Sequence, residues 1–232
     1  ISLFGEDPWD LSADAKARLG YVPQTVRLYP WMKVRQIVAY TSAFYETWDG
    51  ELAGTLLDRW ELPREQRISP LSPGQLQKLA LVLALSYRPD LLVLDEPVAS
   101  LDPIARREFL RSLLEHCGDQ NHTVLFSTHI TSDLERVASH LALLKDGRIA
   151  VFEELDSLKD RVKRLRIAAR EDLPRDFTVR GALQVQITAN RAVVAVDCLD
   201  DELIDEIRDR WHADVAVEDL NLEEIFLELH RG

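Results

Sequence analysis

The segment that most constrains the fold is a short apolar run that ends in two adjacent carboxylates, LLVLDEP at residues 91–97. A second apolar run, TVLFSTH at residues 123–129, follows a stretch with helical periodicity. Short continuous apolar runs closed by polar residues are typical of parallel strands that are buried on both faces. Because strand, helix and strand alternate, the pattern predicts an open α/β sheet with right-handed crossovers.

The helix between these strands is predicted over residues 103–117. Asp102 is a suitable N-cap, and Pro103 takes the first helical position. Five apolar residues with helical spacing then predict a buried stripe, namely Ile104, Phe109, Leu110, Leu113 and Leu114.

Residues 25–90 interrupt the strand pattern. They hold five prolines and helical stretches such as 34–45 and 52–60, without a convincing strand. We interpret them as a helical subdomain inserted into a sheet domain that spans residues 1–155. A hairpin about Asp146-Gly147 is expected near the end of that domain.

Residues 160–232 are expected to form a small C-terminal α+β accessory domain. A basic run at 159–170 precedes two alternating strands, around residues 185–187 and 193–196. A helix is predicted over 201–211. A last helix begins at Asn221, where Glu224 has capping-box spacing.

Charge and hydropathy exclude several classes of protein. The 232 residues carry 28 Lys and Arg against 40 Asp and Glu, a net charge of -12, which argues against general binding to nucleic acid. The longest apolar run, Leu79 to Leu85, is far shorter than the ~20 residues of a membrane span. No secretory signal is visible, and Cys117 and Cys198 are isolated, so a cytosolic compartment is expected.

The carboxylates Asp95 and Glu96 are the strongest candidates for chemistry. The carboxyl ends of strands in open α/β sheets are where such proteins bind ligands. One carboxylate could hold Mg²⁺, and the other could accept a proton from an attacking water. The alternative is a strand that simply ends in an acidic helix cap.

A second candidate is the predicted helix start at residues 71–75. Ser72 is a good N-cap, Pro73 suits the first turn, and the free N–H groups of such a terminus suit a phosphate oxyanion. Read alone, such a segment is more often an ordinary helix start.

Two polar residues complete the set. His129 ends the second strand and could contact a phosphate or orient a water. Gln24 closes a short apolar strand and could ligate a metal weakly or bind a water. Each could also be an ordinary hydrogen-bonded residue.

The order and spacing of these segments resemble the nucleotide-binding domain of ABC-type ATPases over residues 1–155. The resemblance implies a P-loop NTPase-like sheet core with ATP and Mg²⁺ as cofactors. By this resemblance Gln24 belongs to the Q-loop, and residues 71–75 are the signature motif, in which Ser72, Gly74 and Gln75 contact nucleotide. Asp95 is the Walker B aspartate, and Glu96 is the catalytic glutamate. Asp102 belongs to the D-loop, and His129 is the switch histidine.

The resemblance further implies two ATPase subunits, identical or different, that sandwich ATP head to tail and drive transport through a separate integral membrane permease. Asp95 and Gln24 would contact the metal, and Glu96 and His129 would carry catalysis. The subunit would lie on the cytoplasmic face of the membrane through its permease. Two other functions stay open: a non-catalytic regulatory ABC-like protein, and a soluble ABC ATPase outside transport.

The sequence departs from the family pattern in places. Residues 1–23 hold no Gly-x-x-x-x-Gly-Lys-Ser/Thr phosphate loop. We expect that this chain lacks roughly the first 40–50 residues of the family pattern and binds ATP poorly by itself. Pro73, Lys78 and Val98 stand where the family usually has other residues.

Six aromatic residues follow Gln24 within the predicted helical subdomain. They could form the core of that subdomain or a groove for a partner helix, because aromatic residues are favoured at interface hot spots. They are Tyr29, Trp31, Tyr40, Phe44, Tyr45 and Trp48.

Overall fold

The computed structural model describes residues 2–117 and 122–231. The chain forms two compact units, Ile1–His129 and Ile130–Gly232. None of the described helices has the length and apolar character needed to cross a bilayer. The expected boundary between two domains, at residues 155–160, stays a prediction.

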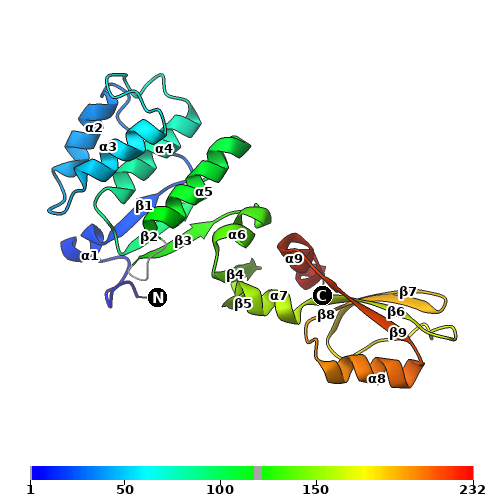
Figure 1. Ribbon diagram of the computed structural model, residues 1–232. Helices are drawn as coiled ribbons and strands as arrows, with labels where there is room; N and C mark the ends of the chain where they lie inside the picture. The colour runs from blue at the N-terminus through cyan, green and yellow to red at the C-terminus, as the bar shows by residue number, and fades with distance from the viewer. Residues whose placement is uncertain (1, 118–121, 232) are drawn as a thin grey trace. The chain divides into compact units, whose positions relative to one another are not determined.

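The first unit contains a parallel three-stranded sheet with its second strand in the centre (Figure 1). The strands are in register, so that Val22 pairs with Leu94, and Leu94 with Phe126. Their carboxyl ends therefore lie at one edge. The predicted α/β class is confirmed. The strands are β1 (Leu19–Val22), β2 (Leu91–Asp95) and β3 (Thr123–Ser127).

Burial differs between the two strands that the sequence predicts. Leu92 and Leu94 of β2 are almost fully buried. In β3, Leu125 is 58% exposed, so the prediction that this strand is buried on both faces is wrong. Thr123, Leu125 and Ser127 alternate along β3 and are all exposed, so the exposure lies on one face of the strand.

Helices cover part of this sheet, and three of them lie beside one another as the inserted helical segment (Figure 1). One of these, α4, is apolar on nearly all sides, which suits a helix inside a core. The helices of this unit are α1 (Ala13–Ala17), α2 (Val34–Ser42), α3 (Gly50–Arg59), α4 (Pro73–Leu85) and α5 (Pro103–Cys117).

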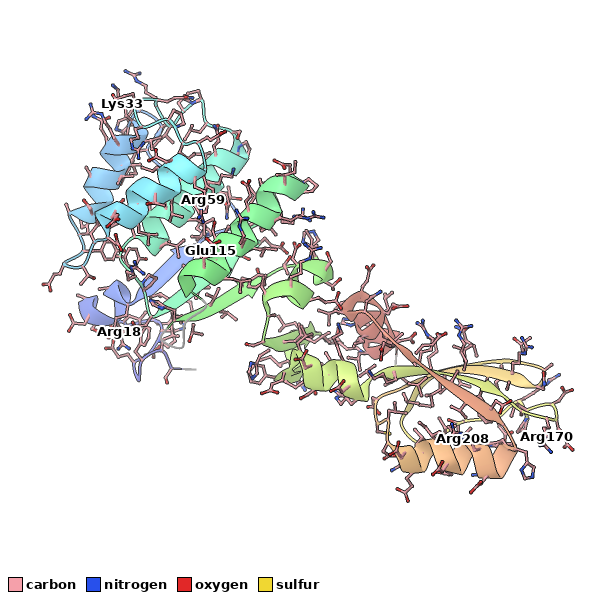
Figure 2. The ribbon with its side chains drawn as sticks, viewed as in Figure 1. Arg18, Lys33, Arg59, Glu115, Arg170 and Arg208 are labelled. Atoms are coloured by element: carbon pink, nitrogen blue, oxygen red, sulfur yellow. The ribbon has the colours of Figure 1, made fainter. Side chains whose placement is uncertain are left out.

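Helix α5 runs alongside the sheet and is tied to α3. Arg59 Nη1 lies 2.6 Å from Glu115 Oε2 and donates to Ser112 Oγ at 3.2 Å (Figure 2). Three residues of the predicted stripe are buried, but Ile104 is 73% exposed and Leu114 46%. These two are corrections to that prediction, because the buried face of α5 is narrower than the apolar pattern.

The second unit begins with a short helix, a hairpin and another helix. The hairpin turns at Asp146-Gly147, as expected, and Gly147 has a φ of +74° that favours glycine. These elements are α6 (Thr131–Val137), β4 (His140–Lys145), β5 (Arg148–Glu154) and α7 (Leu155–Arg161).

A four-stranded antiparallel sheet follows, in the order β7-β8-β6-β9. Helix α8 packs on it through Leu203 and Ile207, which join the buried sheet residues in one apolar core. The sequence missed two of the strands, β6 and β9. The elements are β6 (Lys163–Ala168), β7 (Ala182–Thr188), β8 (Arg191–Val196), α8 (Asp201–Trp211), β9 (Asp214–Asp219) and α9 (Leu222–Arg231).

Candidate functional site

The carboxyl edge of the parallel sheet holds the two predicted carboxylates. Asp95 is the last residue of β2 and pairs in register with Ser127 of β3. The Ser127 hydroxyl donates to Asp95 Oδ1 at 2.7 Å. Ser127 Oγ in turn accepts the Glu96 backbone N–H at 3.0 Å, and the Ser127 carbonyl oxygen accepts the same N–H at 3.2 Å.

Glu96 follows the strand in an unusual backbone conformation. Its φ is +46°, in the left-handed region that costs a non-glycine residue about 1 kcal/mol or more. Its carboxylate reaches His129, whose Nδ1 lies 2.9 Å from both oxygens. The Glu96 side chain is only 18% exposed, whereas His129 is 71% exposed. The imidazole of His129 is therefore accessible to a ligand while its Nδ1 contacts the Glu96 carboxylate.

Gln24 lies at the same edge but outside this cluster. It follows the end of β1 by two residues and is exposed. Among the described residues, no hydrogen bond joins it to Asp95 or Glu96. The structure thus leaves it at the rim of the edge.

The start of α4 forms a second group of predicted residues. Ser72 Oγ accepts the N–H of Gln75 at 3.2 Å, and Gln75 Oε1 accepts the N–H of Ser72 at 3.0 Å. This reciprocal capping box orders the first turn, with Pro73 at its start. The N–H groups of that turn belong to the positive end of the helix dipole.

Gly74 packs closely against the segment before α5. A Cβ at this position would lie 3.3 Å from both Leu101 Cδ2 and the Ser100 carbonyl oxygen. An open depression of about 670 Å³ lies here. It is lined by Ser72, Pro73, Gly74, Gln75, Lys78, Ser100, Leu101, Asp102 and Ala105.

Asp102 caps α5 beside this depression. Its Oδ1 accepts the N–H groups of Ile104 at 2.9 Å and Ala105 at 3.1 Å. These backbone donors, with a smaller contribution from the Lys78 charge, hold the pKa of Asp102 below its usual value. Asp102 is therefore ionised at neutral pH.

The structure therefore gathers the predicted residues into two groups within the first unit. Asp95, Glu96 and His129 form one, and the α4 start with Asp102 forms the other. Within the described part of the chain no hydrogen bond or ion pair joins the two groups. The sequence analysis gave no role to Ser127, because its hydroxyl is brought opposite Asp95 only by the register of the folded sheet.

The residues present fit Mg²⁺ bound mainly through phosphate and water. Among the described residues, no three His, Cys, Asp or Glu side chains are grouped to hold a metal by themselves. Mg²⁺ is commonly bound by one or two carboxylates with substrate phosphates. Ser127 occupies one oxygen of Asp95, and the other oxygen is the candidate ligand.

Comparison with known proteins shows what this chain is similar to. Residues 3–99 match the family model for the ABC transporter domain. The chain is a homologue of ABC transporter ATP-binding proteins. The matched segment contains Gln24, the start of α4, Asp95 and Glu96.

Individual ABC ATP-binding proteins agree with this. The ABC transporter ATP-binding protein YtrB of Bacillus subtilis (strain 168) is 27% identical over 158 residues, 68% of this chain and 54% of the relative. The uncharacterized ABC transporter ATP-binding protein YhaQ of the same strain is 28% identical over 221 residues, 91% of this chain and 74% of the relative.

A solved structure, described as the ATP-binding subunit of an ABC transporter, has a TM-score of 0.60 at 26% identity. It covers 67% of each chain. The P-loop NTPase-like core is thereby confirmed. The chain spans about half the length of the first of these curated relatives.

Proposed function

We propose that the natural protein binds ATP with Mg²⁺ and hydrolyses it as the ATP-binding subunit of an ABC transporter. The observation that carries the proposal is the contact between Glu96 and His129 beside the Asp95–Ser127 pair. In this proposal Glu96 accepts a proton, and Asp95 binds a metal.

Each residue of the sheet edge has a role in this proposal. Asp95 would hold the Mg²⁺, which neutralises phosphate charge when bound. Glu96 accepts the proton of the attacking water, and His129 orients that carboxylate. Phosphoryl transfer to water needs such positioning more than covalent chemistry. Gln24, at the rim, is placed to contact the γ-phosphate or its metal.

The α4 start is proposed to serve the second subunit of a head-to-tail pair. Ser72, Gly74 and Gln75 open a helix whose N-terminus favours a phosphate oxyanion. Because no bond links this group to Glu96 within the described residues, a facing copy, identical or not, would complete each site. Asp102 lies beside it in the same depression.

A membrane subunit is the proposed partner, and an exposed aromatic patch is its proposed docking surface. Trp31 is 65% exposed and Phe44 68%. Their rings are linked through Tyr29 and Tyr40, with centroids 5.1–5.8 Å apart. Aromatic rings left in water in this way are typical of interaction surfaces. Through this partner the subunit would lie on the cytoplasmic side of the membrane.

Residues 1–232 alone are proposed to bind ATP weakly. Residues 1–23 hold no phosphate-loop sequence to supply a lysine for the β- and γ-phosphates. Experiments on turnover therefore use the natural full-length protein.

Complementation between two variants tests the composite site. Glu96→Gln removes the proton acceptor, and Gly74→Asp places a carboxylate where phosphate would bind. In a mixed dimer of these chains, one site is intact and the other carries both lesions. We expect each variant alone to be nearly inactive. If the protein is a homodimer, an equal mixture of the two variants should recover about one quarter of wild-type turnover, because half of the dimers are mixed and each of these has one intact site of two.

Two controls complete this experiment. Glu171→Gln, at an exposed position outside the site, should keep wild-type turnover. Size-exclusion measurement should show that the mixed chains form dimers with ATP. A mixture that forms dimers yet shows no turnover above either variant contradicts the composite site.

A further inference from the structure

We infer that Ser127 is a positioning residue that sets both carboxylates of the site through one hydroxyl group. The inference rests on the proposed function, because it assigns to Asp95 and Glu96 their roles in ATP hydrolysis. Ser127 itself is not placed to touch the reacting atoms. It acts through Asp95, the last residue of β2, and Glu96, which follows that strand.

The two hydrogen bonds of the Ser127 hydroxyl have opposite directions. A serine hydroxyl has one proton, and here it points to Asp95 Oδ1 at 2.7 Å. The hydroxyl oxygen is then an acceptor, and it takes the Glu96 N–H at 3.0 Å. A hydrogen bond to a carboxylate is stronger than one between neutral groups, so the rotamer of Asp95 is fixed.

The backbone of Glu96 contacts the same residue. Its left-handed φ of +46° is unfavourable, and such conformations persist only where the surroundings over-determine them. Both acceptors of the Glu96 N–H belong to Ser127, namely its hydroxyl and its carbonyl oxygen at 3.2 Å. This backbone conformation brings the Glu96 carboxylate to 2.9 Å from His129 Nδ1.

The register of the sheet sets which hydroxyl faces Asp95. Asp95 and Ser127 are partners across the parallel β2–β3 pair. A hydroxyl at residue 127 therefore faces the end of β2, whereas one at residue 123 lies at the opposite end of the same strand. Ser127 is exposed, so an added methyl group has room. Valine can therefore replace Ser127 without its methyl groups overpacking a core.

The experiment compares Ser127→Thr with Ser127→Val in the natural full-length protein. The two side chains have the same shape and differ by a hydroxyl in place of a methyl, and both suit a strand. Thr123→Val makes the same loss at the other end of β3 and is the matched control. Turnover of ATP, its dependence on Mg²⁺ concentration, and ATP binding in EDTA are measured for each.

We expect Ser127→Val to lower kcat about tenfold and to raise the Mg²⁺ concentration for half-maximal turnover. ATP binding without metal should stay at the wild-type value. Ser127→Thr and Thr123→Val should keep wild-type kcat and Mg²⁺ dependence. Rescue by threonine separates a role of the hydroxyl from a general effect on the strand.

A second readout does not depend on activity. Exchange of the Glu96 amide hydrogen, measured by NMR, should be about tenfold faster in Ser127→Val than in Ser127→Thr. Equal exchange, or equal kcat and Mg²⁺ dependence, in the two variants overturns the inference. Absence of ATP turnover in the wild-type protein would overturn the proposed function, and the amide exchange would still decide the role of Ser127. If Ser127→Val does not fold, Ser127→Ala replaces it.

Discussion

Gly20 lies in β1 and pairs with Leu92 of β2. A Cβ built at this position would lie 2.7 Å from Leu92 Cδ1 and 3.0 Å from Pro89 Cγ. Leu92 is 1% exposed and cannot move aside freely. The absence of a side chain at residue 20 therefore leaves room for Leu92 where β1 pairs with β2.

We expect Gly20→Ala to lower the free energy of unfolding by about 1–3 kcal/mol, because the added methyl overpacks the strand contact. Gly54→Ala is the control. Gly54 lies within α3, and a Cβ there would meet only Arg64 Nη2 at 3.8 Å. That change should stabilise the helix by about 0.5–1 kcal/mol. Denaturant unfolding measures both, and equal effects would contradict the packing argument.

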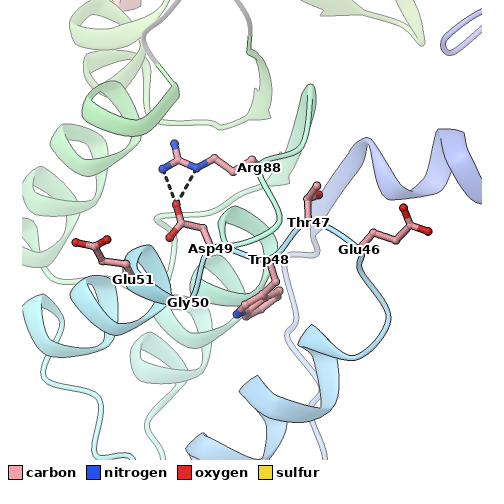
Figure 3. Close-up of a pocket in the computed structure, with 7 residues that line it drawn as sticks. All are labelled: Glu46, Thr47, Trp48, Asp49, Gly50, Glu51 and Arg88. Carbon is pink, nitrogen blue, oxygen red and sulfur yellow. Dashed lines mark hydrogen bonds and ion pairs between the residues drawn. The ribbon is translucent and has the colours of Figure 1, made fainter.

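Asp49 holds the start of α3 beside an open depression of about 610 Å³ (Figure 3). Its Oδ1 accepts the Leu52 N–H at 2.8 Å, and Oδ2 accepts two N–H groups of Arg88 at 2.7 and 3.1 Å. The Leu52 N–H first, and then Arg88, hold the pKa of Asp49 below its usual value. The ionised form is therefore the stabilising one.

The stability that Asp49 contributes is fully present above its unfolded pKa of about 3.9 and is lost as pH falls through the lower folded value. At pH 7, Asp49→Ala should cost about 1–2 kcal/mol of unfolding free energy. The difference from wild type should shrink below pH 4, in unfolding curves recorded across pH. Glu46→Ala, at an exposed position of the same depression, is the control and should leave the unfolding free energy at pH 7 close to the wild-type value. A constant Asp49→Ala difference down to pH 2 would contradict this cause.

The candidate site shows which residues a sequence pattern can and cannot predict. Asp95, Glu96 and His129 follow apolar runs, so their place at the strand ends follows from local pattern alone. Ser127 acts on Asp95 from 32 positions away, through a register that only the folded sheet sets. The Glu96 N–H is likewise held by Ser127, through two hydrogen bonds that the residue type of Glu96 does not predict.

At the scale of elements, local pattern predicts those whose stability is local. Helix α8 was predicted with its observed ends, and its N-cap Asp200 accepts the Leu203 N–H at 2.7 Å. Strands β6 and β9 were missed because their charged residues interrupt the apolar pattern. Those charges pair across the sheet, as in Lys163 with Asp219 at 2.6 Å, over a long separation in sequence.

Helix α9 depends on a distant residue in the same way. Glu135 of α6 accepts the N–H of Leu222, the first residue of α9, at 2.8 Å, and it pairs with Lys159 at 3.2 Å. Leu222 and Ile225 are buried in one apolar cluster with α7 residues. The carboxylate of Glu135 thus caps a helix that lies 87 residues further along the chain.

We expect Glu135→Ala to destabilise the second unit by about 1–2 kcal/mol and to speed hydrogen exchange in α9. The loss leaves the Leu222 N–H without its acceptor. Glu223→Ala, exposed in the first turn of α9, is the control and should change exchange little. Unchanged exchange in α9 after Glu135→Ala would show that apolar packing alone holds this helix.

At the scale of the whole molecule, the exposed aromatic patch is the surface that we assign to a partner. Of the six aromatic residues noted in the sequence, four are exposed and form the patch around Trp31, whereas Tyr45 is half-buried and stacks on Tyr87 at 3.8 Å. Sequence pattern could not separate these two environments. The exposed patch therefore belongs to assembly with a partner, in our proposal.

Trp31→Ala tests that assembly. We expect it to reduce co-purification with the membrane subunit while the unfolding midpoint stays at the wild-type value. Trp60→Ala is the matched control, since Trp60 is 3% exposed and its loss should cost about 3–5 kcal/mol. A Trp31→Ala protein that is destabilised and still binds the membrane subunit would assign the patch to the core.

The most direct test of the account is the turnover of Glu96→Gln in the natural full-length protein. Glutamine keeps the shape of the side chain and cannot accept the proton of the attacking water. We predict that kcat for ATP hydrolysis falls about 100-fold or more while ATP affinity is kept. A Glu96→Gln protein that hydrolyses ATP at the wild-type rate would contradict the role given to the sheet edge.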